Sequence, residues 1–311
     1  MLPTVPLGST GLAVSPLCLG GNVFGWTADE DESAAVLDAY VAAGGNFIDT
    51  ADGYGNWVEG NPRGMSERII GRWMAARGNR DELVIATKVG RAQGMRGLSS
   101  QTIRTGAEES LRRLGTDRID LYYAHADDPE TPLEETMGAF DELVRTGTVL
   151  HAAASNYTAP RLAEALRVSD REGFARYVAL QPEYNLVSRS EYEGELQALC
   201  VAEGLACMPY SALASGFLTG KYRPDGPEVQ SARAASARRH LARAAHMLEV
   251  LDEIAASRST TVAAVALAWL RAQPGVTAPI ASARTPDQLA ALLPMGELEL
   301  LSEELERLSA A

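Results

Sequence analysis

The chain has 311 residues, a formal net charge of −13 at pH 7 and a hydrophobic content of 46%. Its length allows one large α/β domain or two smaller ones, and its hydrophobic content supports a substantial core. An acidic chain repels polyanions, which argues against nucleic acid or an anionic membrane as the main partner.

Short apolar segments alternate with amphipathic helical patterns along the chain. We expect a hairpin that turns at residues 9–11, followed by eight strands that each precede helix. The strands are expected at residues 17–19, 46–49, 83–88, 119–125, 149–154, 177–180, 205–209 and 276–280. The helices are expected at residues 32–43, 66–77, 100–114, 132–146, 159–168, 190–203, 236–271 (more than one helix) and 286–293. This alternation implies a parallel sheet with helices on its outside.

Eight strand–helix units favour a closed (β/α)₈ barrel, the TIM barrel, over an open doubly wound sheet. An open nucleotide-binding sheet would normally carry the pattern G-x-G-x-x-G after its first strand, and residues 20–25 (GGNVFG) do not match it. The longest stretch without a predicted element, residues 211–230, follows the seventh strand; long loops in compact domains are usually functional or mobile. No linker or low-complexity tract interrupts the chain, so we expect residues 1–311 to form a single domain.

The N-terminus, the apolar runs and the cysteines together predict a cytoplasmic protein. Residues 1–8 have no charged segment followed by an apolar one, so we expect no signal peptide. The longest uninterrupted apolar run, residues 262–270, is far shorter than the roughly 20 residues that a membrane span needs. Cys18, Cys200 and Cys207 have neither metal-binding nor redox spacing, which indicates buried thiols in a reducing compartment and no metal site.

Four residues among the first 125 carry the predicted chemistry. Asp49, Lys88 and His125 end predicted strands, and Tyr54 follows in the loop after one of them. Active sites of (β/α)₈ barrels lie at this end of the strands. An ammonium beside a tyrosine lowers the pKa of its phenol, so we expect Lys88, held protonated by Asp49, to lower the pKa of Tyr54. His125 can position a carbonyl oxygen or share in the proton transfer, so the four residues suit proton transfer to that oxygen.

The order and spacing of short segments along the chain resemble the aldo-keto reductase family, in its bacterial aryl-alcohol-dehydrogenase-like branch. The resemblance covers nearly the whole chain, from about Leu7 to Leu293. The segments are 46–55 (NFIDTADGYG), 87–88 (TK), 120–125 (DLYYAH), 155–157 (SNY), 181–185 (QPEYN), 209–211 (PYS), 216–222 (GFLTGKY) and 283–289 (ARTPDQL).

This resemblance implies a barrel enzyme that reduces a small aldehyde or ketone to an alcohol with NADPH, which becomes NADP⁺. Tyr54 would be the proton donor, supported by Asp49, Lys88 and His125. The residues implied to bind the nicotinamide are Ser155, Asn156, Gln181 and Tyr210, the last by stacking on the ring. The loop 211–220 would wrap the pyrophosphate, Arg284 would meet the 2′-phosphate and Gln288 the adenine. The implied contacts from the loop and its end are Ser211, Leu213, Gly216, Leu218 and Lys221.

Two other functions stay open at this point. Some members of the family are accessory subunits of membrane channels, so the chain could be a cofactor-bound regulatory or redox-sensing subunit with slow turnover. A (β/α)₈ sugar isomerase or lyase without nicotinamide would need metal-binding carboxylates or a Schiff-base lysine, for which Lys88 is the candidate. Trp26 and Trp57 lie in loops that could line a substrate pocket, but the sequence does not determine the substrate, the preference for NADPH over NADH, the reaction direction or the oligomeric state.

Overall fold

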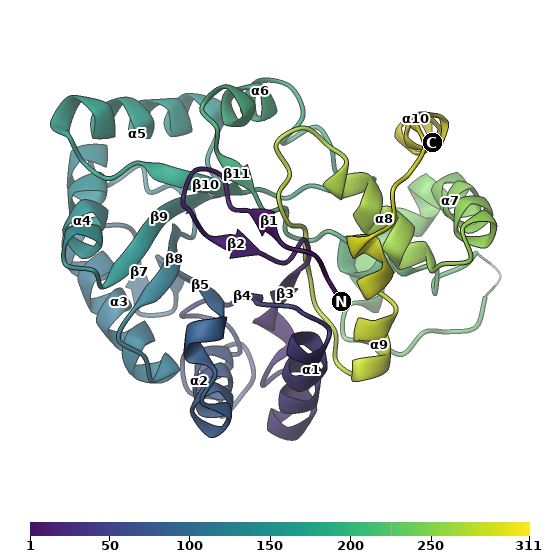
Figure 1. The fold of residues 1–311 in the computed structure, drawn as a ribbon, viewed down its shortest axis with the longest axis horizontal. Coiled ribbons are helices and arrows are strands. Elements are labelled where there is room, and N and C mark those ends of the chain that lie inside the picture. The colour runs from purple at the N-terminus through teal and green to yellow at the C-terminus, as the bar shows by residue number, and fades with distance from the viewer. Residues whose placement is uncertain (225) are drawn as a thin grey trace.

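The computed structural model describes residues 1–224 and 226–311 and has eight parallel strands curled into a barrel (Figure 1). The strands, in their order around the sheet, are β11 (Ala206–Cys207), β10 (Tyr177–Gln181), β9 (Val149–Ser155), β8 (Ile119–Ala124), β5 (Val84–Val89), β4 (Phe47–Asp49), β3 (Cys18–Gly20) and β12 (Ile280–Ala281). The sheet closes between β11 and the segment before β12. There the Cys207 amide donates to the Gly275 carbonyl at 3.1 Å, and the Thr277 amide donates to the Cys207 carbonyl at 2.8 Å. The predicted (β/α)₈ barrel is therefore confirmed.

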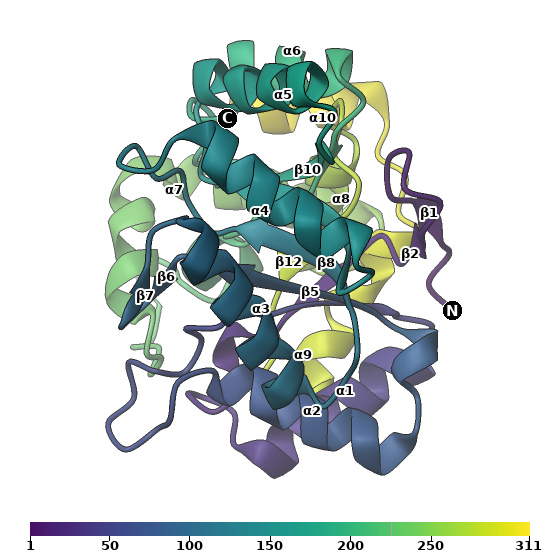
Figure 2. The same ribbon diagram turned by 90° about the vertical axis from the view of Figure 1, so that its left-hand side faces the viewer.

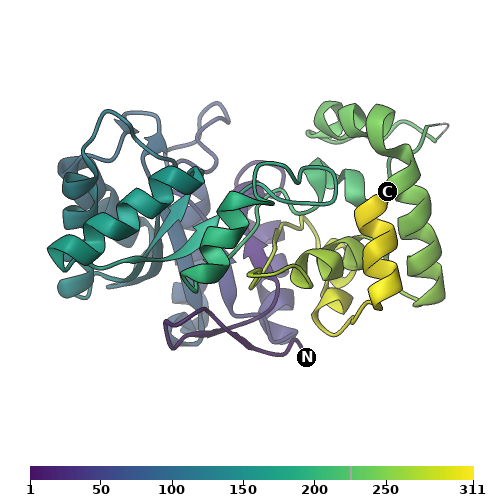
Figure 3. The ribbon, with the colours of Figure 1, turned by 90° about the horizontal axis from the view of Figure 1, so that it is seen from above.

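Helices surround the sheet, as Figures 1 and 3 show. They are α1 (Glu30–Ala42), α2 (Met65–Arg77), α3 (Ser100–Leu114), α4 (Leu133–Arg145), α5 (Ala159–Glu172), α6 (Glu195–Ala202), α7 (Ala234–Ser257), α8 (Val262–Arg271), α9 (Pro286–Ala290) and α10 (Ser302–Ala310). Short 3₁₀ segments are η1 (Gly21–Val23), η2 (Arg80–Glu82), η3 (Ala214–Thr219) and η4 (Leu293–Gly296). Because helices cover one face of the sheet and the barrel interior covers the other, β5 and β8 are buried along their whole length. Among the described residues, no helix combines the length and apolar character that a membrane span requires.

Two short ribbons lie at opposite ends of the barrel (Figure 2). The predicted N-terminal hairpin is present as β1 (Val5–Pro6) and β2 (Ala13–Val14), which pair antiparallel. Leu7 and Val14 of this segment are fully buried in the apolar cluster that fills the barrel, so the hairpin closes the end where the strands begin. At the other end, β6 (Arg91–Ala92) and β7 (Met95–Arg96) form a ribbon that the sequence pattern did not predict.

Several boundaries differ from the prediction. Helix α6 begins at Glu195 rather than near residue 190, because Gly194 has φ +98° and ψ −126°, which is not helical. The last strand is β12, at residues 280–281, so it shares only Ile280 with the expected strand 276–280, and Val276 forms an isolated bridge to Cys207. The expected loop 211–230, of which residue 225 lies outside the described residues, contains η3.

The C-terminal helix α10 was also not predicted. It lies beside α7 (Figure 3), and Leu308 is its one fully buried apolar side chain. Its first turn is held by polar contacts instead. The Glu304 carboxylate accepts from the Leu301 amide at 2.7 Å and pairs with Arg258 at 2.7 Å. Leu301, Leu305 and Leu308 follow the i, i+4, i+7 spacing of an amphipathic helix, so the sequence carried a helix pattern that the prediction overlooked.

Candidate active site

The period of the strands explains why polar side chains gather at one end of the barrel. Side chains of a strand alternate between its two faces, so every second residue points into the barrel. The barrel interior is filled in part by Phe47, Ala86 and Tyr123. Two positions further along the same strands, this alternation brings Asp49, Lys88 and His125 to the inner face at the carboxyl end. By the same alternation, Ser155 at the end of β9 and Gln181 at the end of β10 also lie on the inner face at the carboxyl end.

Lys88 is the centre of this polar group. It is 0% exposed, and its ammonium contacts the Asp49 carboxylate at 2.6 and 2.8 Å, the Thr50 carbonyl at 2.8 Å and the Tyr54 hydroxyl at 3.2 Å. Burial lowers the pKa of Lys88, but Asp49 and Tyr54 outweigh burial and leave that pKa above its ordinary value. Lys88 is therefore a buried ammonium paired with a buried carboxylate, as the sequence predicted.

Tyr54 is held by a short loop that folds back on β5. The Thr50 amide donates to the Ala86 carbonyl at 2.8 Å, and the Asp52 amide donates to the Lys88 carbonyl at 3.2 Å. Lys88 lowers the pKa of the Tyr54 phenol, as expected. The expectation that this pKa lies below its ordinary value is nevertheless wrong. Burial raises the pKa of Tyr54 by more than Lys88 lowers it, so its pKa lies above the ordinary value near 10. The phenol is therefore fully protonated at neutral pH and is an acid.

His125 lies beside Tyr54 with a ring-centroid separation of 6.1 Å in an edge-on arrangement. Burial and the charges of Lys88 and Arg91 lower the pKa of His125 well below its ordinary value near 6.5, so the imidazole is neutral at physiological pH. Its Nδ1 has no hydrogen-bond partner among residues 1–224 and 226–311. This Nδ1 is buried, so the ring nitrogen left to face a ligand is Nε2.

The residues implied to bind a nicotinamide are joined to one another by hydrogen bonds. The Tyr210 hydroxyl donates to Asn156 Oδ1 at 2.8 Å, and Asn156 Nδ2 donates to Ser155 Oγ at 3.0 Å. Ser155 Oγ donates to the Gln181 carbonyl at 2.8 Å, and Gln181 Nε2 donates to Asp49 Oδ1 at 2.9 Å. The four residues therefore form one continuous chain that ends on the carboxylate of the Lys88 ion pair.

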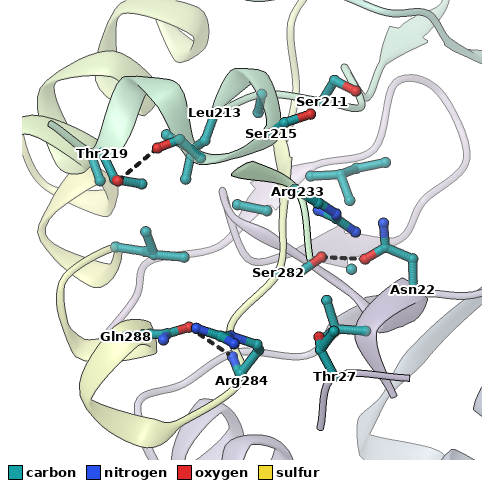
Figure 4. Close-up of a pocket in the computed structure, with 18 of the residues that line it drawn as sticks. Asn22, Thr27, Ser211, Leu213, Ser215, Thr219, Arg233, Ser282, Arg284 and Gln288 are labelled. Carbon is teal, nitrogen blue, oxygen red and sulfur yellow. Dashed lines mark hydrogen bonds between the residues drawn. The ribbon is translucent and has the colours of Figure 1, made fainter. Parts of the chain in front are cut away.

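A cavity of about 620 Å³ opens from this polar group (Figure 4), within the roughly 300–1,000 Å³ typical of small-molecule sites. Asp49 and Tyr54 line it at one end, and Arg284 and Gln288 line it at the other. Of the residues implied to bind a cofactor, those that line the cavity are Tyr210, Ser211, Leu213, Gly216, Lys221, Arg284 and Gln288. Ser155, Asn156 and Gln181 lie outside the lining, and Leu218 is fully buried in the core. The Leu218 side chain therefore points away from the cavity, and its predicted contact with the cofactor could come only from its backbone.

The loop that contains η3 lines the cavity with Ser211, Leu213, Ser215 and Gly216, among others. Ser211, Ala214 and Ser215 have positive φ angles of 55°, 47° and 59°, and Gly216 has φ 90°. Such left-handed residues are uncommon for non-glycine types and cluster at ligand-binding sites. Figure 4 shows Ser211, Leu213 and Ser215 along one wall of the cavity.

Among the described residues, three cations line the cavity: Lys221, Arg233 and Arg284. Asp49 is the one acidic side chain that these residues contribute to the lining, and Lys88 already neutralises it. None of the three cations forms an ion pair with a carboxylate in the part of the chain that the structure describes. Burial together with Arg284 and Arg233 lowers the pKa of Lys221. In a chain of net charge −13, this unpaired positive charge marks a site for an anion.

Sequence reasoning missed Arg233. Its guanidinium lies over the Trp26 ring at 5.2 Å and points into the cavity beside Asn22 and Ser282 (Figure 4). The chain has 28 Lys and Arg residues, of which all but Lys88 and Lys221 are Arg, so one more Arg gave no signal. Trp26 and Trp57 meet edge to face at 5.6 Å, and Trp57 also meets Tyr54 at 6.1 Å, which places both tryptophans at the Tyr54 end of the cavity.

Comparison with known proteins gives consistent matches over most of the chain. Residues 16–311 match the model of the Aldo/keto reductase family. An uncharacterized oxidoreductase of Bacillus subtilis (strain 168) is 37% identical over 97% of this chain and 94% of its own length. The norsolorinic acid reductase stcV of Emericella nidulans is 34% identical over 95% of this chain and 77% of its own length. A probable voltage-gated potassium channel subunit beta of Oryza sativa subsp. japonica is 34% identical over 91% of this chain and 88% of its own length.

Proposed function

The chain belongs to the aldo/keto reductase family, and from that premise we propose that it reduces an aldehyde or ketone to an alcohol with NADPH, with Tyr54 as the proton donor. The observation that carries the proposal is the position of the Tyr54 hydroxyl, which lies 3.2 Å from the Lys88 ammonium at one end of the cavity. Elsewhere the described lining of this cavity contains three cations that have no acidic partner among the described residues. The whole chain, residues 1–311, is proposed to act as one barrel domain.

The donor set of the cavity fits a phosphorylated dinucleotide. Lys221, Arg233 and Arg284 lack acidic partners among the described residues, and Arg presents donors that match phosphate oxygens. Arg284 is proposed to meet the 2′-phosphate and Gln288 the adenine. Their arrangement supports this, because the Arg284 amide donates to Gln288 Oε1 at 3.1 Å and both side chains lie together in Figure 4.

The bound cofactor would supply the hydride that reduces the carbonyl carbon. Tyr54 would give its hydroxyl proton to the carbonyl oxygen, which becomes the alcohol. The phenolate left on Tyr54 is then 3.2 Å from the Lys88 ammonium, and Asp49 holds that ammonium in place. His125, neutral at physiological pH, would position the carbonyl oxygen through its ring. Ser155, Asn156, Gln181 and Tyr210 would fix the nicotinamide end of the site.

A second candidate is a cofactor-bound regulatory subunit with slow turnover. The observation that favours it is the 34% identity, over 91% of this chain, to a probable potassium channel subunit beta. Both candidates use the same cavity and differ in turnover.

One experiment separates them. NADPH and NADH binding would be measured by fluorescence titration, and NADPH oxidation would be followed over a panel of aldehydes and ketones, for wild type and Tyr54→Phe. Binding of NADPH by both proteins, with turnover only in the wild type, is the result expected of a reductase that uses Tyr54. Tight binding with no turnover on any carbonyl would favour the regulatory subunit, and no binding of either nucleotide would refute both.

A further inference from the structure

Asp52 is a buried carboxyl group for which the proposed reaction has no role, and it lies in the loop between Asp49 and Tyr54. It is 1% exposed, and neither of its carboxyl oxygens has a hydrogen-bond partner in residues 1–224 and 226–311. Nearly all buried polar groups in proteins are hydrogen-bonded, and a buried charge without partners is especially costly. The surroundings therefore favour the neutral carboxylic acid over the carboxylate.

The negative charge that acts on Asp52 is that of Glu67 on α2, which is itself 0% exposed. Its carboxylate is already engaged: it accepts from the Thr87 hydroxyl at 2.6 Å and from Arg113 Nε at 2.6 Å. A second negative charge at Asp52 would meet this carboxylate inside the same buried cluster. Burial and Glu67 raise the pKa of Asp52 to about 7.

Neighbouring cations lower the pKa of Asp52, but they do not cancel the rise caused by burial and Glu67. The charged and titratable groups that act on Asp52 come from every element packed against it: Glu67 on α2, Arg113 on α3, Arg63 in the segment before α2, Lys88 on β5 and Tyr122 on β8. Arg113 is already paired with Glu67 and Glu109, and Arg63 is paired with Glu109. The positive charge that remains for Asp52 is therefore small.

The loop ties Asp52 directly to the catalytic ion pair. The Asp52 amide donates to the Lys88 carbonyl at 3.2 Å, and the Thr50 carbonyl accepts from the Lys88 ammonium at 2.8 Å. Lys88 and Asp52 also act on each other through their charges. A negative charge on Asp52 would draw on the same ammonium that stabilises the phenolate of Tyr54.

We propose that Asp52 is a positioning residue that is neutral in the active protein, and that its ionisation weakens Tyr54 as an acid and slows carbonyl reduction. The kinetic part of this proposal rests on the proposed function of Tyr54. The titration of Asp52 does not, and it can be measured without any substrate.

The kinetic test is the pH dependence of the rate of NADPH oxidation at saturating carbonyl substrate, for wild type and Asp52→Asn. Asn has the shape of the neutral acid and cannot ionise. We expect the wild-type rate to fall as pH rises through about 7. We expect Asp52→Asn to keep its rate at pH 6 within about threefold and to lose this fall, because only the charge has been removed. A fall that persists unchanged in Asp52→Asn would overturn the kinetic proposal. A merely structural role would lower the rate by the same factor at every pH.

A neighbouring cation gives a variant that leaves Asp52 itself intact. Arg63 lowers the pKa of Asp52, so Arg63→Gln should move the midpoint of the fall to higher pH. The matched control is Arg72→Gln on α2, whose partner is Glu30 at the surface, and it should leave the midpoint in place. An unchanged midpoint in Arg63→Gln, or a midpoint shifted to lower pH, would contradict the proposal even if Asp52→Asn fails to fold.

The thermal unfolding midpoint from pH 4 to pH 9 supplies a readout that needs no activity. Asp52→Asn should gain stability relative to wild type as pH rises toward 7 and then level off. Parallel curves for the two proteins would refute the titration of Asp52. If no variant turns over any carbonyl, the proposed function and the kinetic part fail together, while the unfolding curves still decide whether Asp52 is neutral in the native protein.

Discussion

Replacing Lys88 by Met tests how strongly the centre of the site depends on its ion pair. The ammonium has four contacts, and without it the Asp49 carboxylate keeps one donor from a side chain, Gln181 Nε2 at 2.9 Å. Asp49 is 2% exposed, so water does not replace the lost partner. Removing one member of a buried ion pair leaves the other charge uncompensated and typically costs about 3–5 kcal/mol. We expect Lys88→Met to lower the free energy of unfolding by that amount.

A double-mutant cycle sharpens this prediction. Asp49→Asn alone leaves the buried ammonium without its carboxylate and should cost a similar amount. Asp49→Asn combined with Lys88→Met removes both charges and leaves neither uncompensated, so its cost should be below that of either single variant and far below the sum of about 6–10 kcal/mol. The free energies would be measured by urea unfolding at pH 7, with equal m-values as the check on two-state behaviour.

Lys221→Met is the matched control, because Lys221 is the other lysine of the chain and is exposed in the cavity without an acidic partner among the described residues. It should change the stability by no more than about 0.5 kcal/mol. Costs for Asp49 and Lys88 that simply add in the double variant would refute the idea that the two side chains act as a buried pair.

Three further predictions follow from the same geometry. Arg284→Ala should weaken NADPH binding by about 10- to 150-fold in a fluorescence titration, equivalent to about 1.5–3 kcal/mol for a hydrogen bond to a charged group. The same variant should leave NADH binding nearly unchanged. Equal losses for both nucleotides would contradict the assignment of Arg284 to the 2′-phosphate. Because the pKa of His125 is well below 6.5, the rate of carbonyl reduction should not fall between pH 7 and pH 6, and a fall there that His125→Gln abolishes would show that the imidazole titrates. Since the pKa of Asp52 rises from 3.8 to about 7 on folding, the native state binds its proton more tightly than the unfolded state does. Wild type should therefore lose about 4 kcal/mol of unfolding free energy relative to Asp52→Asn between pH 4 and pH 7.5. Denaturant unfolding at each pH measures this difference, and a difference that does not change with pH would contradict the prediction.

The sequence predicted the barrel and the convergence of Asp49, Tyr54, Lys88 and His125 at its rim, because both depend on local periodicity. Apolar segments of a few residues placed the strands, and the position of Asp49, Lys88 and His125 at the ends of those segments placed them at one rim. The number and order of the strand–helix units then implied that segments far apart in the sequence lie side by side in the barrel. Short elements such as β6 and β7, with two residues each, have no period to detect.

Properties that depend on the assembled environment could not be predicted in this way. The sequence indicated that Lys88 lowers the pKa of Tyr54, but the opposing effect of burial follows only from the packing around the phenol. Leu218 belongs to a glycine-rich segment that suggested cofactor contact, and η3 turns it into the core. Arg233 lies in a segment with no strand or helix pattern of its own, so its place in the cavity depends on how α7 packs against η3.

The chain of hydrogen bonds from Tyr210 to Asp49 has a consequence for the entropy of binding. Tyr210, Asn156 and Ser155 each have a hydrogen-bond partner in the next residue, which for Ser155 is the Gln181 backbone carbonyl, and the Gln181 side chain is held by Asp49. Much of the conformational freedom of these side chains is therefore already lost when the protein folds. A ligand that reaches the site meets groups that do not have to be ordered again, and this preorganisation favours both affinity and a fixed reacting geometry. The same rigidity means that a substitution at Tyr210, on the far side of the barrel rim, should be felt at the Asp49–Lys88 pair through the intervening amides.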